Sequence, residues 1–292
     1  MRLTIKHTTS YAFSEPVTHA LQRLRLTPKA TQGQAILDWN MTYENAHPEL
    51  EYDDQHFNTV TLVAVEPGAR EVSVTCEGTV ETRDSAGVIG HHSGHLPLWS
   101  FLCETPLTKP GPKLRALIRE VHAPPEGGGL DYLHALSAHI RERVEYMKGT
   151  SDVSTGAEEA VATGSGVCQD QAHIFIAAAR EADIPARYVS GYLMMDDRVD
   201  QDATHAWAEA HIERLGWVGF DIANGISPDP RYVRVATGRD FRDAAPLIVH
   251  AFGSVEQVLT VNENVAVAEE SEASSQQQAQ HAAQAENVQK QQ

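Results

Sequence analysis

The sequence predicts an α+β protein in which an N-terminal antiparallel β-sandwich-like domain precedes a second domain of helices and strands. Up to about residue 82, apolar and polar residues alternate or β-branched residues cluster, as in strands that bury one face. Residues 113–183 then carry apolar side chains at helical spacing, and residues 185–261 return to short strand-like runs. A chain of 292 residues with 41% hydrophobic content can bury a core in each of two domains.

The N-terminal β-domain is expected to span residues 1–84. Residues 2–7 alternate polar and apolar side chains, and residues 59–65 are rich in β-branched types. Residues 71–80 alternate in the same way and put Cys76 on the apolar face. We therefore interpret Cys76 as a packed core thiol, since a free cysteine behaves as a small apolar residue.

A linker is expected at residues 85–112, because glycine and proline recur there and the interiors of helices and strands avoid both. Its cysteine, Cys103, follows no helix-start signal and has no nearby base, so we interpret it as structural. The segment also holds His91, His92 and His95, which lack the fixed spacing of a zinc-binding pair on a helix. We therefore expect neither a metal ion nor a cofactor.

The second domain is expected over residues 113–262. Its helices are predicted at residues 113–122, 130–144 and 157–163, with a fourth from Cys168 to about Asp183. Its strands are predicted at residues 185–194, 206–212, 217–221, 232–236 and 255–261. Residues 263–292 are rich in Gln, Ala and Glu with little to bury, and we expect them to form a disordered tail.

Cys168 is the candidate nucleophile. It follows a Gly-Ser-Gly-Val run at residues 164–167 and opens an Ala-rich segment typical of a helix. Unpaired backbone N–H groups and the positive end of the dipole at a helix N-terminus favour a thiolate over a thiol. The backbone N–H of Cys168 is also a candidate oxyanion donor, because the preceding glycines leave room for a substrate.

His205 is the candidate general base, and Asp221 is the residue expected to orient it. The segment between them is typical of two strands joined by a tight turn around residues 213–216. Facing residues of a hairpin are equally far from the centre of its turn, so His205 and Asp221 are predicted to be near one another, without an exact pairing. A carboxylate that accepts one ring N–H fixes the imidazole tautomer and leaves the other nitrogen for the thiol.

Two other histidines are weaker candidates for the base. His173 lies five residues after Cys168, about 140° around a helix, and so points away from the thiol. His211 shares the strand face of His205 but stands about 20 Å further along the strand, at about 3.3 Å per residue.

The sequence also resembles a known family, the bacterial transglutaminase-like proteins. Four motifs carry this resemblance: Gly-Val-Cys168-Gln-Asp, Ile184-Pro-Ala-Arg-Tyr-Val-Ser-Gly-Tyr192, His205-Ala-Trp, and Gly216-Trp-Val-Gly-Phe-Asp221. The resemblance covers about residues 101–253 and extends more loosely to an N-terminal β-domain at residues 2–82. It implies a papain-related α+β catalytic core with catalytic roles at Cys168, His205 and Asp221. A second oxyanion donor is usual in such sites, and Tyr146 is our candidate, because a phenol at a helix end can donate outward.

The predicted chemistry is attack of the thiolate on an amide to form an acyl-enzyme. With water as the second nucleophile, the protein is a hydrolase of peptide or isopeptide-type amide bonds, which we favour because water is always present. With an amine as the second nucleophile, it is a transglutaminase. A third alternative is a non-catalytic scaffold that uses the same fold to recruit partners.

Composition narrows the partners and the compartment. The 40 acidic and 23 basic residues give a net charge of −17, which would repel a phosphate backbone, so nucleic acid is not an expected partner. The N-terminus lacks the apolar run of a signal peptide, and no stretch reaches the roughly 18 apolar residues that cross a bilayer. Three widely spaced cysteines argue against a disulfide framework. We expect a cytoplasmic protein with a peptide or protein substrate and no membrane contact, and the sequence leaves its oligomeric state open.

Overall fold

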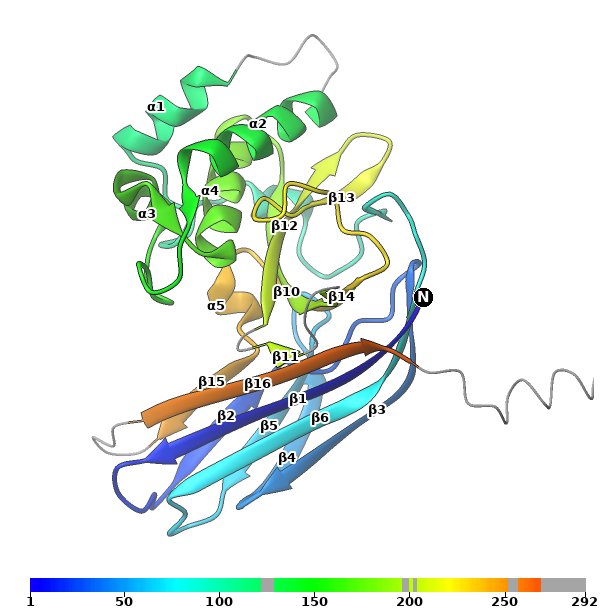
Figure 1. Ribbon diagram of the computed structural model, residues 1–292, viewed down its shortest axis with the longest axis vertical. Coiled ribbons are helices and arrows are strands. Elements are labelled where there is room, and N and C mark those ends of the chain that lie inside the picture. Colours follow the sequence, from blue (N-terminus) through cyan, green and yellow to red (C-terminus); the bar gives the residue numbers. More distant parts are fainter. Residues whose placement is uncertain (122–128, 196–199, 202–203, 252–256, 269–292) are drawn as a thin grey trace, which may run out of the picture.

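The computed structural model describes residues 1–121, 129–195, 200–201, 204–251 and 257–268. These residues form a two-sheet β-sandwich and, stacked on it, a second domain in which helices cover a further sheet (Figure 1). The strands of both parts are mainly antiparallel, and the helices gather in the second part. The predicted α+β class is therefore confirmed.

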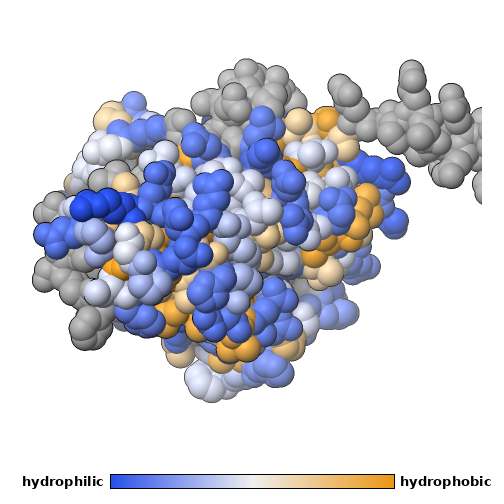
Figure 2. Space-filling model, turned by 90° about the horizontal axis from the view of Figure 1, so that it is seen from below, coloured by the Kyte–Doolittle hydropathy of each residue, from blue (hydrophilic) through white to orange (hydrophobic). Residues whose placement is uncertain are grey.

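Two sheets form the sandwich. The strands of the first are, in order, β11 (Asp200–Gln201), β16 (Gln257–Val267), β1 (Arg2–Phe13), β6 (Glu71–Thr82) and β3 (Gln34–Glu44). The strands of the second are, in order, β15 (Leu247–Ala251), β2 (Ala20–Leu24), β5 (Thr59–Val65) and β4 (Ala46–Asp53). Seen from below, the surface is mostly hydrophilic and is interrupted by several small hydrophobic areas (Figure 2).

Alternation of side chains in β1 and β6 buries one face of the first sheet. In β1, Leu3 and Ile5 are buried while their immediate neighbours are exposed. The same alternation in β6 buries Cys76, and this burial raises the pKa of its thiol to about 12. Cys76 is therefore the core thiol that the sequence predicts.

The C-terminal strands belong to the sandwich, which corrects the predicted domain boundary at residue 262. Strand β15 pairs with β2, and β16 pairs antiparallel with β1 over eleven residues. Residues 257–261 of the predicted strand at 255–261 thus lie in the sandwich, residues 255 and 256 lie outside the described residues, and the predicted tail from residue 263 begins as strand up to Val267. An alternating pattern defines a strand but not its partner, and β16 covers an edge of β1 that would otherwise be open. Residues 269–292 of the predicted tail lie outside the described residues.

The sheet of the second domain, which lies outside the sandwich, includes part of the predicted linker at residues 85–112. Its strands are, in order, β14 (Tyr232–Gly238), β10 (Ala186–Leu193), β12 (His205–Ile212), β13 (Gly216–Phe220) and β7 (Val88–Gly90). After β7, the short 3-10 helix η1 (Leu98–Phe101) buries Phe101 edge-on against Trp217, with ring centroids 5.2 Å apart. Cys103, just beyond it, is exposed. Glycine and proline in the sequence indicated the turns of this segment. Its strand and its 3-10 helix are held in place by contacts with β13, which is distant in sequence.

The helices cover one face of the sheet of the second domain (Figure 1). They are α1 (Pro112–Glu120), α2 (Gly129–Arg143), α3 (Ala157–Thr163), α4 (Cys168–Glu181) and α5 (Phe241–Ala244). Helix α4 packs on β10 and β12 and is itself covered by α1, α2 and α3. Small alanine side chains at residues 177–179 are fully buried and permit this close packing. The four predicted helices are confirmed, and α4 begins at Cys168 as predicted.

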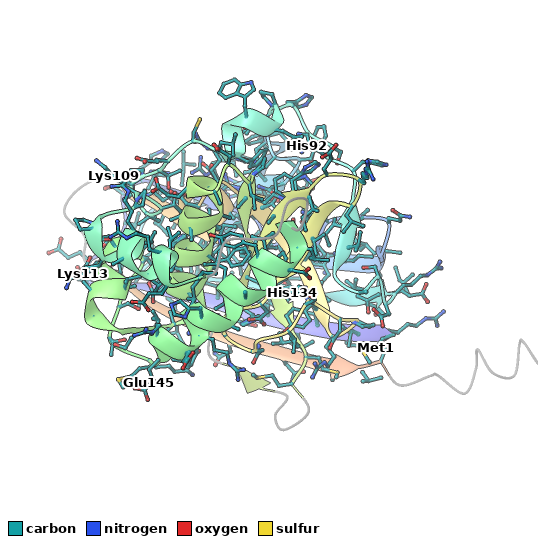
Figure 3. All side chains as sticks on the ribbon, turned by 90° about the horizontal axis from the view of Figure 1, so that it is seen from above. Met1, His92, Lys109, Lys113, His134 and Glu145 are labelled. Atoms are coloured by element: carbon teal, nitrogen blue, oxygen red, sulfur yellow. The ribbon has the colours of Figure 1, made fainter. Side chains whose placement is uncertain are left out.

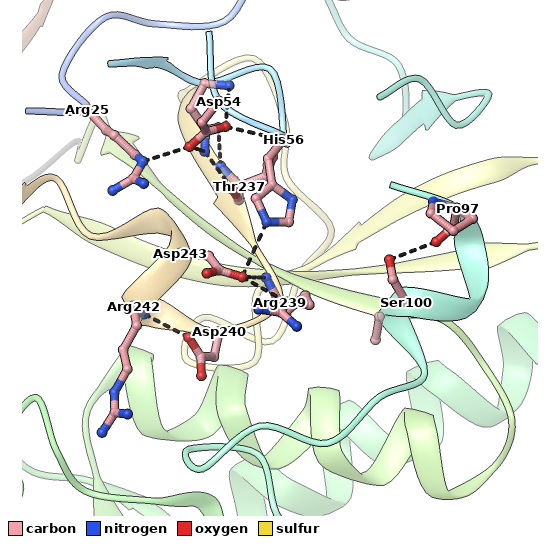
Figure 4. Close-up of polar contacts among 12 residues, drawn as sticks. Arg25, Asp54, His56, Pro97, Ser100, Thr237, Arg239, Asp240, Arg242 and Asp243 are labelled. Atoms are coloured by element: carbon pink, nitrogen blue, oxygen red, sulfur yellow. Dashed lines mark hydrogen bonds and ion pairs between the residues drawn. The ribbon is translucent and has the colours of Figure 1, made fainter. Parts of the chain in front are cut away.

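Polar contacts fix the sandwich against β14 and α5. The backbone N–H of Arg234 donates to Gln34 Oε1 at 2.8 Å, and Gln34 Nε2 donates to the carbonyl of Arg234 at 2.8 Å. Figure 4 shows a second link, in which His56 Nε2 lies 3.2 Å from Asp243 Oδ2. Strand β14 is therefore held from both sides, by β10 and by the sandwich.

Glu209 on β12 is buried between two arginines, and its replacement should destabilise the fold. Its carboxylate accepts hydrogen bonds of 2.6 Å from both Arg187 Nε and Arg234 Nε. Burial tends to raise the pKa of Glu209, but the two guanidinium charges lower it to about 2. We expect Glu209→Gln to lower the free energy of unfolding by about 3–5 kcal/mol, because two buried cations lose their counter-charge. Urea unfolding near neutral pH measures this.

The matched control is Glu181→Gln, which removes a solvent-exposed ion pair with Arg115. We expect no change beyond experimental error, since exposed ion pairs contribute little. The pKa of Glu209 lies below its ordinary value of 4.5, so its contribution is present above pH 4.5 and is lost as the pH falls toward 2. Equal effects of the two substitutions would contradict the account of the buried cluster.

Candidate active site

Cys168 is the first residue of α4 and is partly exposed. The carboxylate of Asp170 caps this helix: its Oδ2 accepts the N–H of Val167 at 2.7 Å and the hydroxyl of Ser151 at 2.5 Å. The first N–H groups of a helix have no acceptor within the helix, so the backbone around Cys168 presents donors and the positive end of the dipole. The cap at Asp170 holds the turn that displays the thiol, a role that the sequence pattern did not predict.

His205 and Asp221 lie together as predicted. His205 is the first residue of β12, and Asp221 follows the last residue of β13. His205 Nε2 and Asp221 Oδ2 are 2.6 Å apart. The hairpin register pairs Ala208 with Phe220, so His205 and Asp221 are not direct cross-strand partners. The prediction of proximity without an exact pair is confirmed.

The ring of His205 also lies close enough to Cys168 to interact with its sulfur. Burial lowers the pKa of His205, but hydrogen bonds to Asp221 and to Cys168 raise it, and the net result is a pKa of about 10. Since Asp221 occupies Nε2, Nδ1 is the ring nitrogen left for the thiol. The structure thus brings together the three residues on which the sequence analysis centred, with the imidazole between the thiol and the carboxylate.

Two residues that the sequence did not predict for the site, Asn224 and Tyr232, hold the carboxylate of Asp221. The hydroxyl of Tyr232 donates to Oδ2 at 2.6 Å, and the side-chain amide of Asn224 donates to Oδ2 at 2.7 Å. Burial opposes ionisation of Asp221, yet its hydrogen bonds from His205, Tyr232 and Asn224 lower its pKa below the ordinary value. Asn224 follows Asp221 by three residues in a turn, and asparagine is a common turn residue, so its position was a local signal for this turn. Tyr232 gives no local signal, because it comes from a different strand.

The ring of Trp207 covers one face of the His205 imidazole. Its ring stacks on that of His205 with centroids 6.1 Å apart and planes at 30°. Gly191 on the neighbouring strand makes this possible, since a Cβ there would lie 2.6 Å from the Trp207 ring. Residues two apart on a strand share a face, so the His-Ala-Trp spacing was a usable signal. Trp207 and Asp221 are both buried, so little water reaches the His205–Asp221 bond.

Tyr146 lies in a short strand beside the chain that leads to Cys168. Strand β8 (Glu145–Tyr146) pairs in parallel with β9 (Ser165–Gly166), and the N–H of Met147 donates to the carbonyl of Gly166 at 2.8 Å. The side chain of Tyr146 is 49% exposed. Tyr146 is therefore paired with Gly166, which precedes Cys168 by two residues. Its side chain is not packed into the core.

The other histidines considered in the sequence, as a base or as metal ligands, include three that pack or hydrogen-bond within the fold: His173, His211 and His92. His173 is fully buried, its Nε2 accepts the N–H of Phe241 at 3.1 Å, and burial lowers its pKa to about 3. His211 packs edge-on against Trp217 at 5.4 Å. Trp217 Nε1 donates to Nδ1 of His92, whose Nε2 bonds to a backbone carbonyl, so both of its ring nitrogens are occupied. Within the described ranges, no three His, Cys, Asp or Glu side chains are grouped to hold a metal ion.

Comparison with known proteins identifies the family of both parts of the chain. A model of the Transglutaminase-like superfamily matches residues 115–222, and a model of the Bacterial transglutaminase-like N-terminal region matches residues 3–81. Uncharacterized proteins of Mycobacterium tuberculosis and Mycobacterium bovis are 30% identical over 270 residues, covering 84% of this chain and 86% of each relative. One of Mycobacterium leprae is 27% identical over 265 residues, covering 84% of this chain and 91% of the relative.

The fold also recurs in a solved structure. A protein of Cytophaga hutchinsonii, described as a candidate cysteine protease, has a TM-score of 0.73 at 22% identity, covering 93% of this chain and 92% of that one. Fold and site define an α+β protein with a helix-terminal cysteine beside a histidine and an aspartate. The chain belongs to the transglutaminase-like superfamily, with the N-terminal region of its bacterial members. This membership supports a thiol-dependent enzyme that acts on amide bonds. Among the described residues, no helix has the length and apolar character to cross a membrane.

Proposed function

We propose that this protein is a thiol-dependent hydrolase of peptide or isopeptide-type amide bonds, with Cys168 as nucleophile, His205 as general base and acid, and Asp221 as the residue that orients His205. One observation carries the proposal: the imidazole of His205 bonds to Asp221 through Nε2 at 2.6 Å and interacts with the sulfur of Cys168. A histidine held in this way stores a proton beside the sulfur. The free thiols at residues 76, 103 and 168 support a reducing compartment, the cytoplasm.

Acylation begins with attack of the Cys168 sulfur on the carbonyl carbon of the amide. The Sγ–C bond forms, and the carbonyl oxygen gains the negative charge of a tetrahedral intermediate. When the intermediate collapses, the C–N bond breaks and the proton on His205 passes to the leaving amine. Asp221 stabilises the imidazolium until that proton leaves, and it keeps the ring in one orientation.

Deacylation decides between hydrolysis and transfer. His205 takes a proton from the incoming nucleophile, which attacks the thioester carbon and expels the Cys168 thiolate. Water gives a carboxylic acid, and an amine gives a new amide, the transglutaminase alternative. We favour water, because it is present at high concentration and the partly exposed Cys168 is open to it.

The oxyanion is proposed to receive hydrogen bonds from the Cys168 backbone N–H and from the phenol of Tyr146. The supporting geometry is the β8–β9 pairing that sets Tyr146 opposite Gly166, with an exposed side chain. We expect Tyr146→Phe to lower kcat by about 10²-fold with little change in KM, since it removes one donor that acts in the transition state. Steady-state kinetics of folded variant and wild type measure this, and unchanged kcat would remove Tyr146 from the oxyanion site.

The proposed function is tested by analysing products from a library of peptides and ε-linked isopeptides by mass spectrometry, with and without a primary amine. Wild-type protein should release new carboxyl termini, and the Cys168→Ala protein should release none. Amide products that form only with the amine, without hydrolysis, would establish the transglutaminase alternative. Absence of both reactions, with no covalent adduct on Cys168, would favour the scaffold.

A further inference from the structure

A groove of about 390 Å³ lies between α2 and the turn that follows β13. On α2 it is lined by His134, Arg141 and Glu142, and on the other side by Phe220, Gly225 and Ile226. His134, labelled in Figure 3, packs its ring edge-on against Phe220 with centroids 5.1 Å apart. The groove therefore has an aromatic and aliphatic floor and charged side chains from α2 at its rim.

Both walls of the groove are bonded to elements that carry candidate active-site residues. Immediately after α2, the carbonyl of Val144 accepts a hydrogen bond of 2.8 Å from Gln171 Nε2, one turn into the helix that Cys168 opens. On the other wall, the N–H of Gly225 donates to the carbonyl of Asp221 at 2.8 Å. One wall thus continues into a segment bonded to the helix that Cys168 opens, and the other is the turn that begins at Asp221, so the groove lies next to the candidate active site.

Arg141 is the cation of this groove. Its guanidinium lies against the Asp221 turn at Gly225, where a Cβ would come within 2.6 Å of Nη1. Gly225 also has a φ of +69°, so glycine is favoured there both by space and by backbone conformation. The missing side chain lets the guanidinium approach the turn directly.

Arg141 has no ion pair or hydrogen bond within the described residues, although the protein has 40 acidic residues. Arg143, two residues later on the same helix, pairs with Glu120, and Arg115 pairs with Glu181. An arginine left unpaired beside an apolar floor is suited to a planar carboxylate, which its forked donors bind in two places. Glu142 at the same rim disfavours a ligand with several negative charges.

We infer that this groove binds the part of the substrate that flanks the scissile amide, and that Arg141 selects a single carboxylate there. The inference rests on the proposed function, because it assigns a substrate feature to that site. The carboxylate is either an acidic side chain or a free C-terminus, and its carbon chain lies along the wall that the exposed Ile226 lines. Arg141 is a specificity residue and takes no part in the covalent step.

The test uses four matched peptides: one with Glu near the scissile amide, its Gln counterpart, and both a free and an amidated C-terminus on a neutral peptide. For wild type we expect kcat/KM to favour one carboxylate over its neutral counterpart by about tenfold, mainly through KM. Which pair shows the preference identifies the source of the carboxylate. The preference should fall to about onefold in Arg141→Gln and remain in Arg143→Gln, the matched control.

Binding of the same peptides to Cys168→Ala protein, by calorimetry, separates this inference from the proposed function. If wild type hydrolyses nothing while Cys168→Ala protein still prefers a carboxylate through Arg141, the selection of a carboxylate by Arg141 stands and the proposed function fails. If wild type hydrolyses peptides without a carboxylate preference, or Arg141→Gln keeps that preference, the inference is overturned and the proposed function stands.

Discussion

Replacement of Cys168 with alanine should lower kcat by on the order of 10⁴- to 10⁶-fold, because the residue supplies the atom that becomes acylated. The fold should be retained, since Cys168 is partly exposed and alanine is a strong helix former. Steady-state rates on a hydrolysed peptide, with protein concentration verified by quantitative amino-acid analysis, measure the loss. Thermal unfolding of the same samples checks the fold.

Cys103→Ala is the matched control for this experiment. Cys103 is the other exposed thiol, and its Sγ has a single hydrogen bond, of 3.7 Å to the carbonyl of Trp99. Its removal should leave kcat within a factor of about two, since surface substitutions away from special features change little. An equal loss in both variants would show that the assay reports a general property of thiols, and full activity in Cys168→Ala would exclude the nucleophile.

Replacement of Asp221 with asparagine should lower kcat by on the order of 10⁴-fold, the size of effect seen when a catalytic histidine loses its carboxylate. Oδ2 of Asp221 accepts from His205, Tyr232 and Asn224, and Oδ1 accepts the backbone N–H of Asn224. Whichever way an asparagine amide turns, its NH₂ group meets a donor. The histidine therefore loses both the charge that stabilises its imidazolium and its fixed orientation.

The same variant should change the dependence of activity on pH. The proposed active form carries a proton on His205, so kcat/KM of wild type should decline as the pH rises through about 10, the pKa of that histidine. Loss of the hydrogen bond and the charge of Asp221 lowers the pKa of His205, so the alkaline decline should begin at a lower pH in Asp221→Asn.

Asp183→Asn is a charge-matched control, because Asp183 is exposed, lies beyond the far end of α4, and has a φ of 58°, which asparagine accommodates. It should keep both the rate and the pH profile of wild type. An alkaline decline at the same pH in Asp221→Asn and wild type would contradict the role of the carboxylate.

Local signals accounted for the parts of the site that lie on single elements. The glycine-rich turn before an alanine-rich run placed Cys168 at a helix start, and hairpin symmetry brought His205 near Asp221. The residues that the sequence did not reveal are those whose role depends on distant chain segments. Tyr232 reaches Asp221 from β14, and the groove that contains Arg141 depends on α2 meeting the turn after β13.

The fold shows the same division between local and distant information. Alternation and helical spacing identified the strands of the sandwich and the helices of the second domain, because both patterns follow from which side chains are buried locally. They did not show that β16 pairs with β1 or that β7 pairs with β13. Strand pairing depends on which edges remain open after the rest of the chain has folded, and this is not a property of the strand's own sequence.

The proposal depends on a protonated His205 beside Cys168, and ¹⁵N NMR of the histidine ring nitrogens observes that proton directly. In wild type, both ring nitrogens of His205 should carry protons between pH 6 and 9 and titrate near pH 10. In Cys168→Ala the titration should move to lower pH, because the contact with the sulfur raises the pKa of His205. A His205 ring that is already neutral at pH 7 in wild type, with the same titration in Cys168→Ala, would contradict the account.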